Sequence, residues 1–183
     1  MYFDNSGNKK NLSFIFSIAK LLKLNLKTVI NTANKFKGLD YRQQIIYKSK
    51  KLLIINDSKS TSFSSTVPLL ESYKNIYWIL GGLAKKGDQL KLKKKYISNI
   101  KAFAYGKDRN YLINSLPNQI SYESSSTLNN IMKILNNNIK SDNTKKVILF
   151  SPSAASFDQF KNFEDRGKFF NKIIKVMFQK IRI

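Results

Sequence analysis

Three short stretches place lysine, hydroxyl, amide and carboxylate side chains directly after apolar runs. Residues 56–61 read Asn-Asp-Ser-Lys-Ser-Thr, and residues 81–88 read Gly-Gly-Leu-Ala-Lys-Lys-Gly-Asp. Residues 151–167 read Ser-Pro-Ser-Ala-Ala-Ser-Phe-Asp-Gln-Phe-Lys-Asn-Phe-Glu-Asp-Arg-Gly. Ammonium groups can neutralise carboxylates or phosphates, while hydroxyls and backbone N–H groups add hydrogen bonds. The three stretches together predict a site for a small anion.

The composition restricts the chemistry that such a site can perform. The chain of 183 residues has neither cysteine nor histidine. This excludes disulfides, cysteine-based zinc sites, thiol nucleophiles and every triad that needs an imidazole base. Any chemistry must therefore use Lys, Arg, Ser, Thr, Asn and a few carboxylates.

Each stretch has a simpler structural interpretation when it is taken alone. Gly82 and Gly87 have the spacing of a phosphate-binding loop, but Asp88 stands where that loop needs a lysine, so this is not a Walker A motif. Residues 56–58 and 151–153 also have the composition of ordinary turns or helix caps. The function must therefore be argued from the three stretches in combination.

The elements that position these stretches form an α/β pattern. The apolar runs Leu52–Ile55, Ile76–Leu80, Ile100–Ala104 and Val147–Phe150 are typical of strands in the middle of a parallel sheet. Gln44–Lys48 is expected to pair with the first run as a hairpin. We therefore predict a Rossmann-like, mostly parallel sheet flanked by helices. In such open sheets, ligands bind beyond the carboxyl ends of the strands, where the three stretches lie.

Two helices are expected before the sheet. Asn11 is a candidate N-cap for the first, in which Ser13, Ser17, Lys20 and Lys23 form the only polar stripe, so that helix is expected to be largely buried. Within the later region, Pro68 is compatible with a helix only near its first turn or at a kink.

The net charge of +22 leaves a second class of function open. Clustered Lys and Arg would bind nucleic acid by neutralising phosphates. The lysines are instead spread along the chain, together with many Asn and Ile residues, which indicates a general composition bias. No apolar run is long enough to cross a bilayer, and the first residues lack the order of a signal peptide, so a cytoplasmic location is expected.

Four motifs, in order along the chain, resemble those of the Mur ligase family, in its D-glutamate-adding branch. Residues 7–11 are a partial version of H-N-x-x-N, and residues 36–42, Phe-Lys-Gly-Leu-Asp-Tyr-Arg, resemble F-x-G-L-P-H-R. Residues 56–61 resemble N-D-S-K-A-T, and residues 151–167 resemble S-P-A-C-A-S-x-D-Q-F-K-N-F-E-x-R-G at nearly every position. The long final motif is the specific one, and the resemblance covers essentially the whole chain.

The chain also departs from the family pattern. Gly7 and Tyr41 stand where the family has His, and Ser153-Ala154 replaces Ala-Cys. The G-x-x-G-K-[ST] loop of the family's central ATPase domain has no counterpart. The resemblance therefore implies a fragment, with residues 1–36 as the helical tail of the central domain and residues 37–183 as the C-terminal Rossmann-like domain.

The resemblance implies a function for the whole enzyme and roles for particular residues. The family adds D-glutamate to UDP-MurNAc-L-alanine in peptidoglycan precursor synthesis, through an acyl phosphate made with ATP and Mg²⁺. The positions that match D-glutamate contacts are Lys59, Thr61, Lys85, Ser156 and Phe163. The positions that match ATP contacts are Asn11, Arg42 and Asp57. No catalytic or metal-binding residue is predicted in this chain, which is expected to be inactive without the missing domains.

The alternative is a free-standing basic module that binds RNA or another polyanion on the same fold. It would have kept the fold and lost the reaction. The joint presence of Lys59, Thr61, Lys85, Ser156 and Arg42 favours the ligase interpretation.

Overall fold

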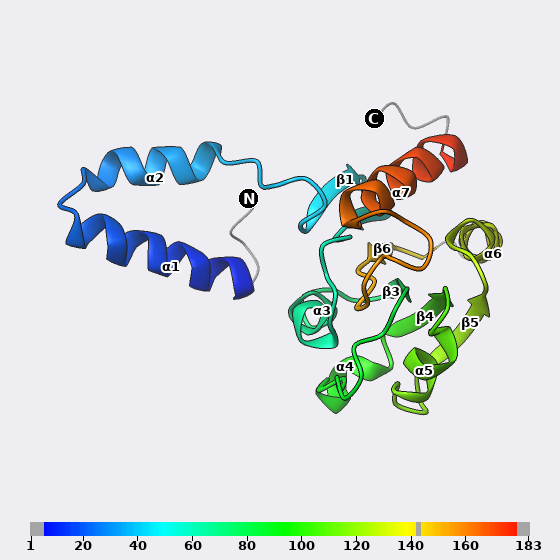
Figure 1. The fold of residues 1–183 in the computed structure, drawn as a ribbon. Helices are drawn as coiled ribbons and strands as arrows, with labels where there is room; N and C mark the ends of the chain where they lie inside the picture. The colour runs from blue at the N-terminus through cyan, green and yellow to red at the C-terminus, as the bar shows by residue number, and fades with distance from the viewer. Residues whose placement is uncertain (1–5, 142–143, 179–183) are drawn as a thin grey trace. The chain divides into compact units, whose positions relative to one another are not determined.

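The computed structural model describes residues 6–141 and 144–178, which form two compact units that meet in sequence between Leu39 and Asp40. The first unit is a pair of helices, α1 (Ser6–Leu21) and α2 (Leu26–Lys35), and the second contains the sheet (Figure 1). No described helix has the length and hydropathy needed to cross a membrane.

The second unit is built on a six-stranded sheet with the order β1-β2-β6-β3-β4-β5. The strands are β1 (Gln44–Lys48), β2 (Leu52–Asn56), β3 (Ile76–Gly81), β4 (Ile100–Tyr105), β5 (Ser121–Ser125) and β6 (Lys146–Phe150). All neighbours are parallel except β1 and β2, which form the expected antiparallel hairpin. The predicted mostly parallel α/β fold is therefore confirmed.

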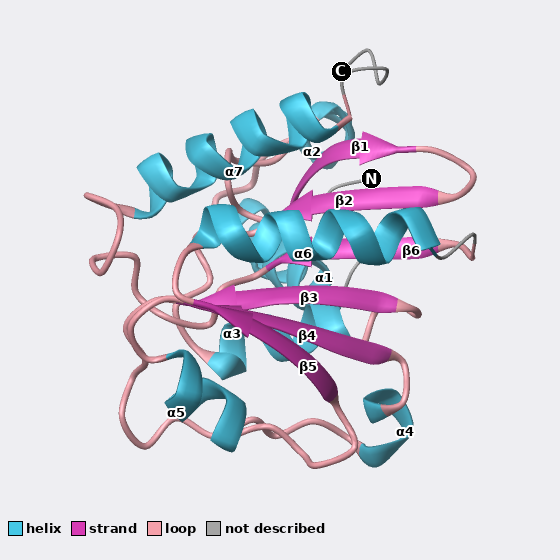
Figure 2. Ribbon diagram, turned by 90° about the vertical axis from the view of Figure 1, so that its right-hand side faces the viewer, coloured by secondary structure: helices cyan, strands magenta, loops and turns pink. Residues whose placement is uncertain are grey.

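Helices cover both faces of this sheet, as Figure 2 shows. One face packs against α3 (Phe63–Leu70), α4 (Lys94–Ile97) and α5 (Arg109–Asn114). The other packs against α6 (Leu128–Ser141) and α7 (Phe163–Met177). All six residues of β3 are buried, because this strand lies inside the sheet and has a helical layer on each side.

The helix α3 accommodates Pro68 without breaking. Ser62 caps this helix by accepting from the Ser65 backbone N–H, and Pro68 is the sixth of its eight residues. Proline cannot donate to the carbonyl of Ser64, one turn earlier, but Ser64 is exposed and water can satisfy that group. The helix then ends two residues after the proline, at Leu70.

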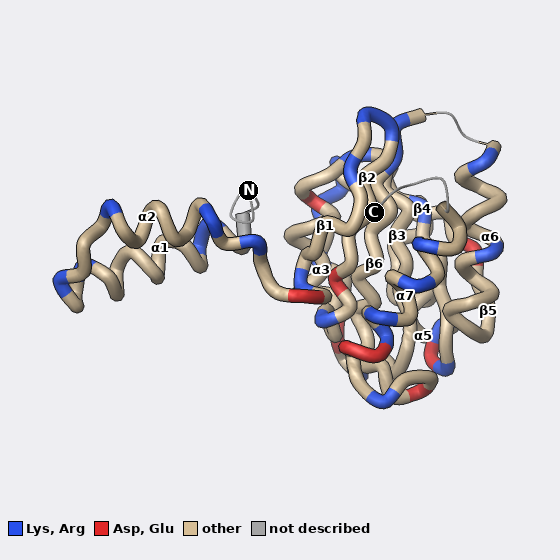
Figure 3. The backbone as a smooth tube through the Cα atoms, turned by 90° about the horizontal axis from the view of Figure 1, so that it is seen from above, with Lys and Arg blue, Asp and Glu red and all other residues tan. Residues whose placement is uncertain are grey.

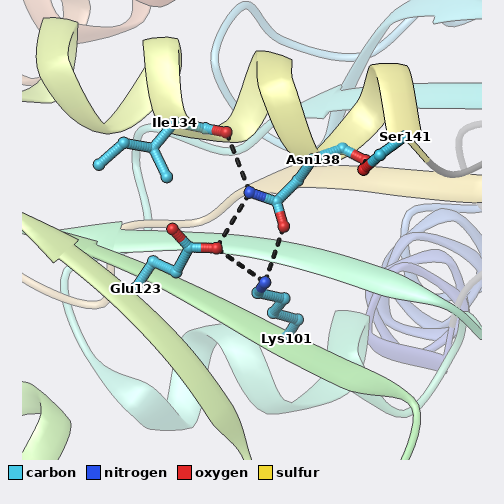
Figure 4. Close-up of polar contacts among 5 residues, drawn as sticks. All are labelled: Lys101, Glu123, Ile134, Asn138 and Ser141. Carbon is cyan, nitrogen blue, oxygen red and sulfur yellow. Dashed lines mark hydrogen bonds and ion pairs between the residues drawn. The ribbon is translucent and has the colours of Figure 1, made fainter.

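A polar cluster holds the far edge of the sheet against α6 (Figure 4). The Lys101 ammonium donates to Glu123 Oε1 at 2.8 Å and to Asn138 Oδ1 at 2.7 Å. Asn138 Nδ2 in turn donates to Glu123 Oε1 at 3.0 Å and to the Ile134 carbonyl at 3.0 Å. The cluster joins β4, β5 and α6, and its groups satisfy one another, so its role is structural.

The first unit differs from the expectation drawn from its sequence. Asn11 is not an N-cap, because α1 begins at Ser6 and Asn11 lies inside the helix. The helix is also not largely buried, since Phe14, Ile18 and Leu21 are 68%, 56% and 80% exposed. Two helices of this length cannot enclose the apolar side chains of both. Of the predicted polar stripe, Ser13, Ser17 and Lys20 lie on α1, whereas Lys23 follows the end of the helix at Leu21 and has a positive φ.

Candidate functional site

The three stretches identified from the sequence lie side by side at the carboxyl edge of the sheet, because β2, β6 and β3 are neighbours. The Asp57 backbone N–H donates to the Phe150 carbonyl at 2.7 Å, and the Gly81 N–H donates to the Pro152 carbonyl at 2.9 Å. Leu83 and Ala155 exchange two backbone hydrogen bonds of 2.9 and 2.8 Å. The loops after the strands therefore form one connected surface.

Lys59 and Phe163 are far apart in sequence but lie in contact in the structure. The Lys59 ammonium lies 4.1 Å from the centroid of the Phe163 ring, a cation–π contact. The Lys59 backbone N–H donates to the Tyr41 carbonyl at 3.0 Å, and Ser58 Oγ donates to the Phe163 carbonyl at 2.8 Å. The half-buried ammonium is held over the ring and has no carboxylate partner among the described residues.

The other three predicted D-glutamate contacts differ in exposure. Ser156 is buried, with 3% of its surface exposed, and its carbonyl accepts from the backbone N–H groups of Gln159 and Phe160. Thr61 and Lys85 are exposed. Lys85 makes no ion pair with any described residue, so its ammonium is available to an anion.

Asp57, a predicted ATP contact, is a buried carboxyl group with 5% of its surface exposed. Its Oδ1 accepts from the Gln43 backbone N–H at 3.0 Å, and its Oδ2 accepts from Ser151 Oγ at 2.8 Å. Burial raises the pKa of Asp57 to about 7, against the opposing effects of these two hydrogen bonds and of the charges on Arg42 and Arg166. The group can therefore change its charge near neutral pH.

Arg42, another predicted ATP contact, is exposed beside Asp57 in a sharply turned segment. The residues on either side of it, Tyr41 and Gln43, have φ values of 60° and 51°. Such left-handed conformations cost roughly 1 kcal/mol or more for residues other than glycine. In this turn the Gln43 N–H donates to Asp57 Oδ1, and the exposed Arg42 lies near enough for its charge to oppose the rise in the pKa of Asp57.

Asn11, the third predicted ATP contact, is exposed on α1 and belongs to the first unit. The structure brings Arg42 and Asp57 together but gives no relation between them and Asn11.

Arg166 is a central residue that the sequence interpretation missed. It is fully buried in α7, and its guanidinium donates to the carbonyls of Ser58 (2.7 Å), Ala154 (2.9 Å) and Gly81 (3.4 Å). It also donates to Ser58 Oγ at 3.1 Å. One side chain therefore ties together the loops that follow β2, β3 and β6.

The sequence did contain a signal for Arg166. Phe163, Arg166, Phe170 and Ile174 recur at helical spacing, so the arginine falls on the apolar stripe of α7. A charged residue on a buried stripe must find several hydrogen-bond acceptors. That position should therefore have been identified as an internal anchor.

The glycine at position 82 is explained by close packing of the backbone. Gly82 has a φ of +129°, and a Cβ atom there would lie 2.1 Å from the Ala155 carbonyl oxygen. Any side chain would therefore separate two of the loops that Arg166 joins.

Basic residues are distributed widely over the described parts of the chain. Figure 3 shows Lys and Arg along both units and few acidic residues. Within residues 6–141 and 144–178, no group of three His, Cys, Asp or Glu side chains is placed to hold a metal ion.

Comparison with known proteins identifies relatives of the chain. No family model matches it. It is 34% identical over 177 residues to the UDP-N-acetylmuramoylalanine-D-glutamate ligase of Wolbachia sp. subsp. Brugia malayi, a match that covers 97% of this chain and 35% of that protein. Ligases with the same name from Rickettsia conorii and Francisella tularensis are each 32% identical, over 93% and 94% of the chain and 34% and 42% of their own lengths.

Solved structures agree with this relationship at the level of the fold. The UDP-N-acetylmuramate-alanine ligase of Thermotoga maritima matches with a TM-score of 0.66 and 15% identity, over 94% of this chain and 38% of that one. A murein peptide ligase from Psychrobacter arcticus matches with a TM-score of 0.53 and 12% identity, over 96% and 38%. The chain thus spans between about a third and two fifths of the length of the relatives that it matches. Its relatives in sequence are D-glutamate-adding ligases of the Mur ligase type, and the chain is similar to a C-terminal part of them.

Proposed function

We propose that this chain is the D-glutamate-binding part of an ATP-dependent ligase that adds D-glutamate to UDP-MurNAc-L-alanine. The observation that carries the proposal is the meeting of Lys59 and Phe163 at the carboxyl edge of the sheet, beside loops fixed by one buried arginine. The relatives named above are ligases of this type, and the long motif at 151–167 lies at this same edge.

The proposed D-glutamate site uses two ammonium groups and two hydroxyls. Lys59 and Lys85 neutralise the two carboxylates of the amino acid, and Thr61 and Ser156 add hydrogen bonds. Phe163 holds the Lys59 ammonium in place through its ring face. D-glutamate carries two negative charges and one ammonium, so two unpaired lysines match its carboxylates.

Two of the proposed ATP contacts, Arg42 and Asp57, lie close enough to interact electrostatically. Arg42 approaches a phosphate or the ribose edge, and Asp57, when ionised, accepts from ribose hydroxyls. Asn11 is proposed as a third contact from the first unit. In the complete ligase ATP supplies the phosphoryl group that activates the UDP-MurNAc-L-alanine carboxylate, with Mg²⁺ screening the phosphates. We assign no Mg²⁺ contact to this part of the ligase. The need for ATP places the proposed function in the cytoplasm.

Binding of D-glutamate to the chain tests the first half of the proposal. Titration with D-glutamate should shift the NMR amide resonances of the loops at 56–61, 81–88 and 151–163. Lys59→Met and Lys85→Met should each weaken binding about tenfold or more, because each removes a charge-assisted contact worth about 1.5–3 kcal/mol.

Lys86→Met is the matched control for these variants. Lys86 is exposed in the same loop as Lys85, so its loss changes the net charge equally without removing a proposed contact. Equal weakening by all three variants would show non-specific attraction and refute the site.

A fusion protein tests the second half of the proposal, the role of this chain in the ligase reaction. The chain joined to the N-terminal and central parts of a related ligase should release ADP only when D-glutamate is present. A fusion that folds, binds ATP and releases no ADP in response to D-glutamate would refute the assignment.

A further inference from the structure

A chain of buried hydroxyl groups runs behind the proposed site, and Thr66 is its branching point. Thr66 lies in α3 with none of its surface exposed. Its Oγ1 is 2.8 Å from Ser151 Oγ, 2.7 Å from Ser153 Oγ and 2.6 Å from Ser60 Oγ. Those three serines are themselves 3% exposed or less.

This series of hydroxyl groups ends at the Asp57 carboxylate on one side and at two loops on the other. Ser151 Oγ donates to Asp57 Oδ2 at 2.8 Å. Ser60 lies between Lys59 and Thr61, and Ser153 is three residues before Ser156. Thr66 therefore connects the proposed ATP contact with two of the three loops that carry proposed D-glutamate contacts.

Each hydroxyl has one proton, so the charge of Asp57 biases the direction of the bonds in this network. When Asp57 is ionised, Ser151 donates to it, which favours a Thr66 proton directed to Ser151 and Ser60 and Ser153 protons directed to Thr66. When Asp57 is protonated and donates to Ser151, Ser151 can donate to Thr66, and the Thr66 proton then turns toward Ser60, Ser153 or the Ser62 carbonyl. Ser60 and Ser153 each have another acceptor at 3.4 Å, so their own protons can turn away from Thr66 in that state.

We propose that Thr66 is a positioning residue that transmits the charge state of Asp57 to the loops holding Lys59, Thr61 and Ser156. The proposal rests on the proposed function for the identity of the two ligands. A nucleotide whose ribose hydroxyl donates to Asp57 favours the ionised carboxylate and so sets the direction of the hydroxyl chain. Binding at one site thereby influences the order of the other, and the coupling is reciprocal.

The surroundings of Asp57 allow this switch near neutral pH. The cationic groups that face it are Arg42 from the turn before β1 and Arg166 from α7, and both favour the ionised form. Burial outweighs them, and the pKa of Asp57 is raised to about 7. Both directions of the hydroxyl chain are therefore accessible between about pH 5 and pH 9.

A pH titration of the isotope-labelled chain by NMR tests the transmission without any ligand. In the wild type, the amide resonances of Ser60 and Ser153 should move with the same midpoint as the Asp57 carboxyl group. Thr66→Val keeps the shape of the side chain and removes the hydroxyl, so both serines should lose this step. Thr66→Ser keeps the hydroxyl and should keep the step, and Asp57→Asn should abolish it everywhere.

Ser60→Ala removes only one of the two branches of hydroxyl groups that leave Thr66. It should remove the step at position 60 and leave it at Ser153, because the other branch from Thr66 stays intact. A wild-type chain without a common midpoint would overturn the proposal. So would a Thr66→Val variant in which Ser60 and Ser153 still follow Asp57.

Titration with D-glutamate at about pH 5.5 and about pH 8 adds a functional readout. The wild-type dissociation constant should differ between the two pH values, and in Thr66→Val this difference should disappear while Thr66→Ser retains it. A wild-type chain that shows no D-glutamate binding at either pH would refute the proposed function, whereas the ligand-free titration still decides the transmission through Thr66.

Discussion

Replacing Asp57 with Asn should change how the stability of the chain depends on pH. The buried carboxyl group has its pKa raised from 3.8 to about 7, so the folded state binds this proton more tightly than the unfolded state does. Its contribution to stability is full below about pH 4 and is lost progressively as the pH rises through 7. Asparagine stays neutral, so the variant lacks this loss.

The size of the effect follows from the rise of about three pKa units. Each unit corresponds to about 1.4 kcal/mol, so the full effect is about 4 kcal/mol, of which about 2.5 kcal/mol falls between pH 5 and pH 8. The asparagine oxygen can still accept from the Gln43 N–H, and its amide can donate to Ser151 Oγ. Any cost of the new amide is therefore a constant offset, and the variant should gain about 2.5 kcal/mol relative to the wild type across this range.

Urea unfolding followed by tryptophan fluorescence measures this difference. Trp78 is the single tryptophan, is fully buried in β3, and donates its indole N–H to the Ser151 carbonyl at 2.8 Å. It therefore reports on the sheet-containing unit and on the edge that carries Asp57. Urea is preferable to guanidinium because a salt would screen the charges being tested.

Subtracting the two stability curves removes every titration that wild type and variant share. A difference that stays constant from pH 5 to pH 8 would refute the raised pKa and the burial argument behind it. A difference that grows in the opposite direction, with the variant losing stability at high pH, would mean that Arg42 and Arg166 stabilise the carboxylate by more than burial costs.

Three further changes test other parts of the structure. Arg166→Lys should destabilise the chain by roughly 3 kcal/mol in the same urea assay, because one ammonium cannot serve the carbonyls that the guanidinium ties together. Gly82→Ala should disturb the loop resonances and lower the unfolding midpoint far more than Gly87→Ala, since both have positive φ but only the first meets a neighbouring carbonyl. Glu123→Gln should lose stability near neutral pH and match the wild type in acid, because its bond from Lys101 lowers the Glu123 pKa and its contribution disappears as the pH falls through that value.

The interior of the sheet was predictable because its strands are apolar on both faces. β3 and β6 contain short, unbroken apolar runs. Runs of this length and composition are typical of strands buried on both faces of a parallel sheet. β5 was missed because its sequence, Ser-Tyr-Glu-Ser-Ser, is polar and lies at the edge, where the ladder with β4 is made by backbone groups and supported by the ion pair between Lys101 and Glu123. Edge strands of this kind carry almost no side-chain signal.

The position of the candidate site was predictable, whereas its internal chemistry was not. Parallel strands deliver their following loops to one edge, so the meeting of the three stretches followed from topology. The raised pKa of Asp57 depends on its burial beside Ser151, which is 94 residues away in sequence. No local pattern reports such a contact. The assignments of particular residues to D-glutamate and ATP stay predictions until binding is measured.

The way in which Arg166 makes its hydrogen bonds limits how the site can evolve. Three of its acceptors are backbone carbonyls, at positions 58, 81 and 154, which every amino acid possesses. Point substitutions that keep the backbone path, unlike a substitution at Gly82, therefore leave these three acceptors in place. Insertion or deletion of a single residue would move a carbonyl away from the guanidinium. The loops should consequently keep a constant length among relatives.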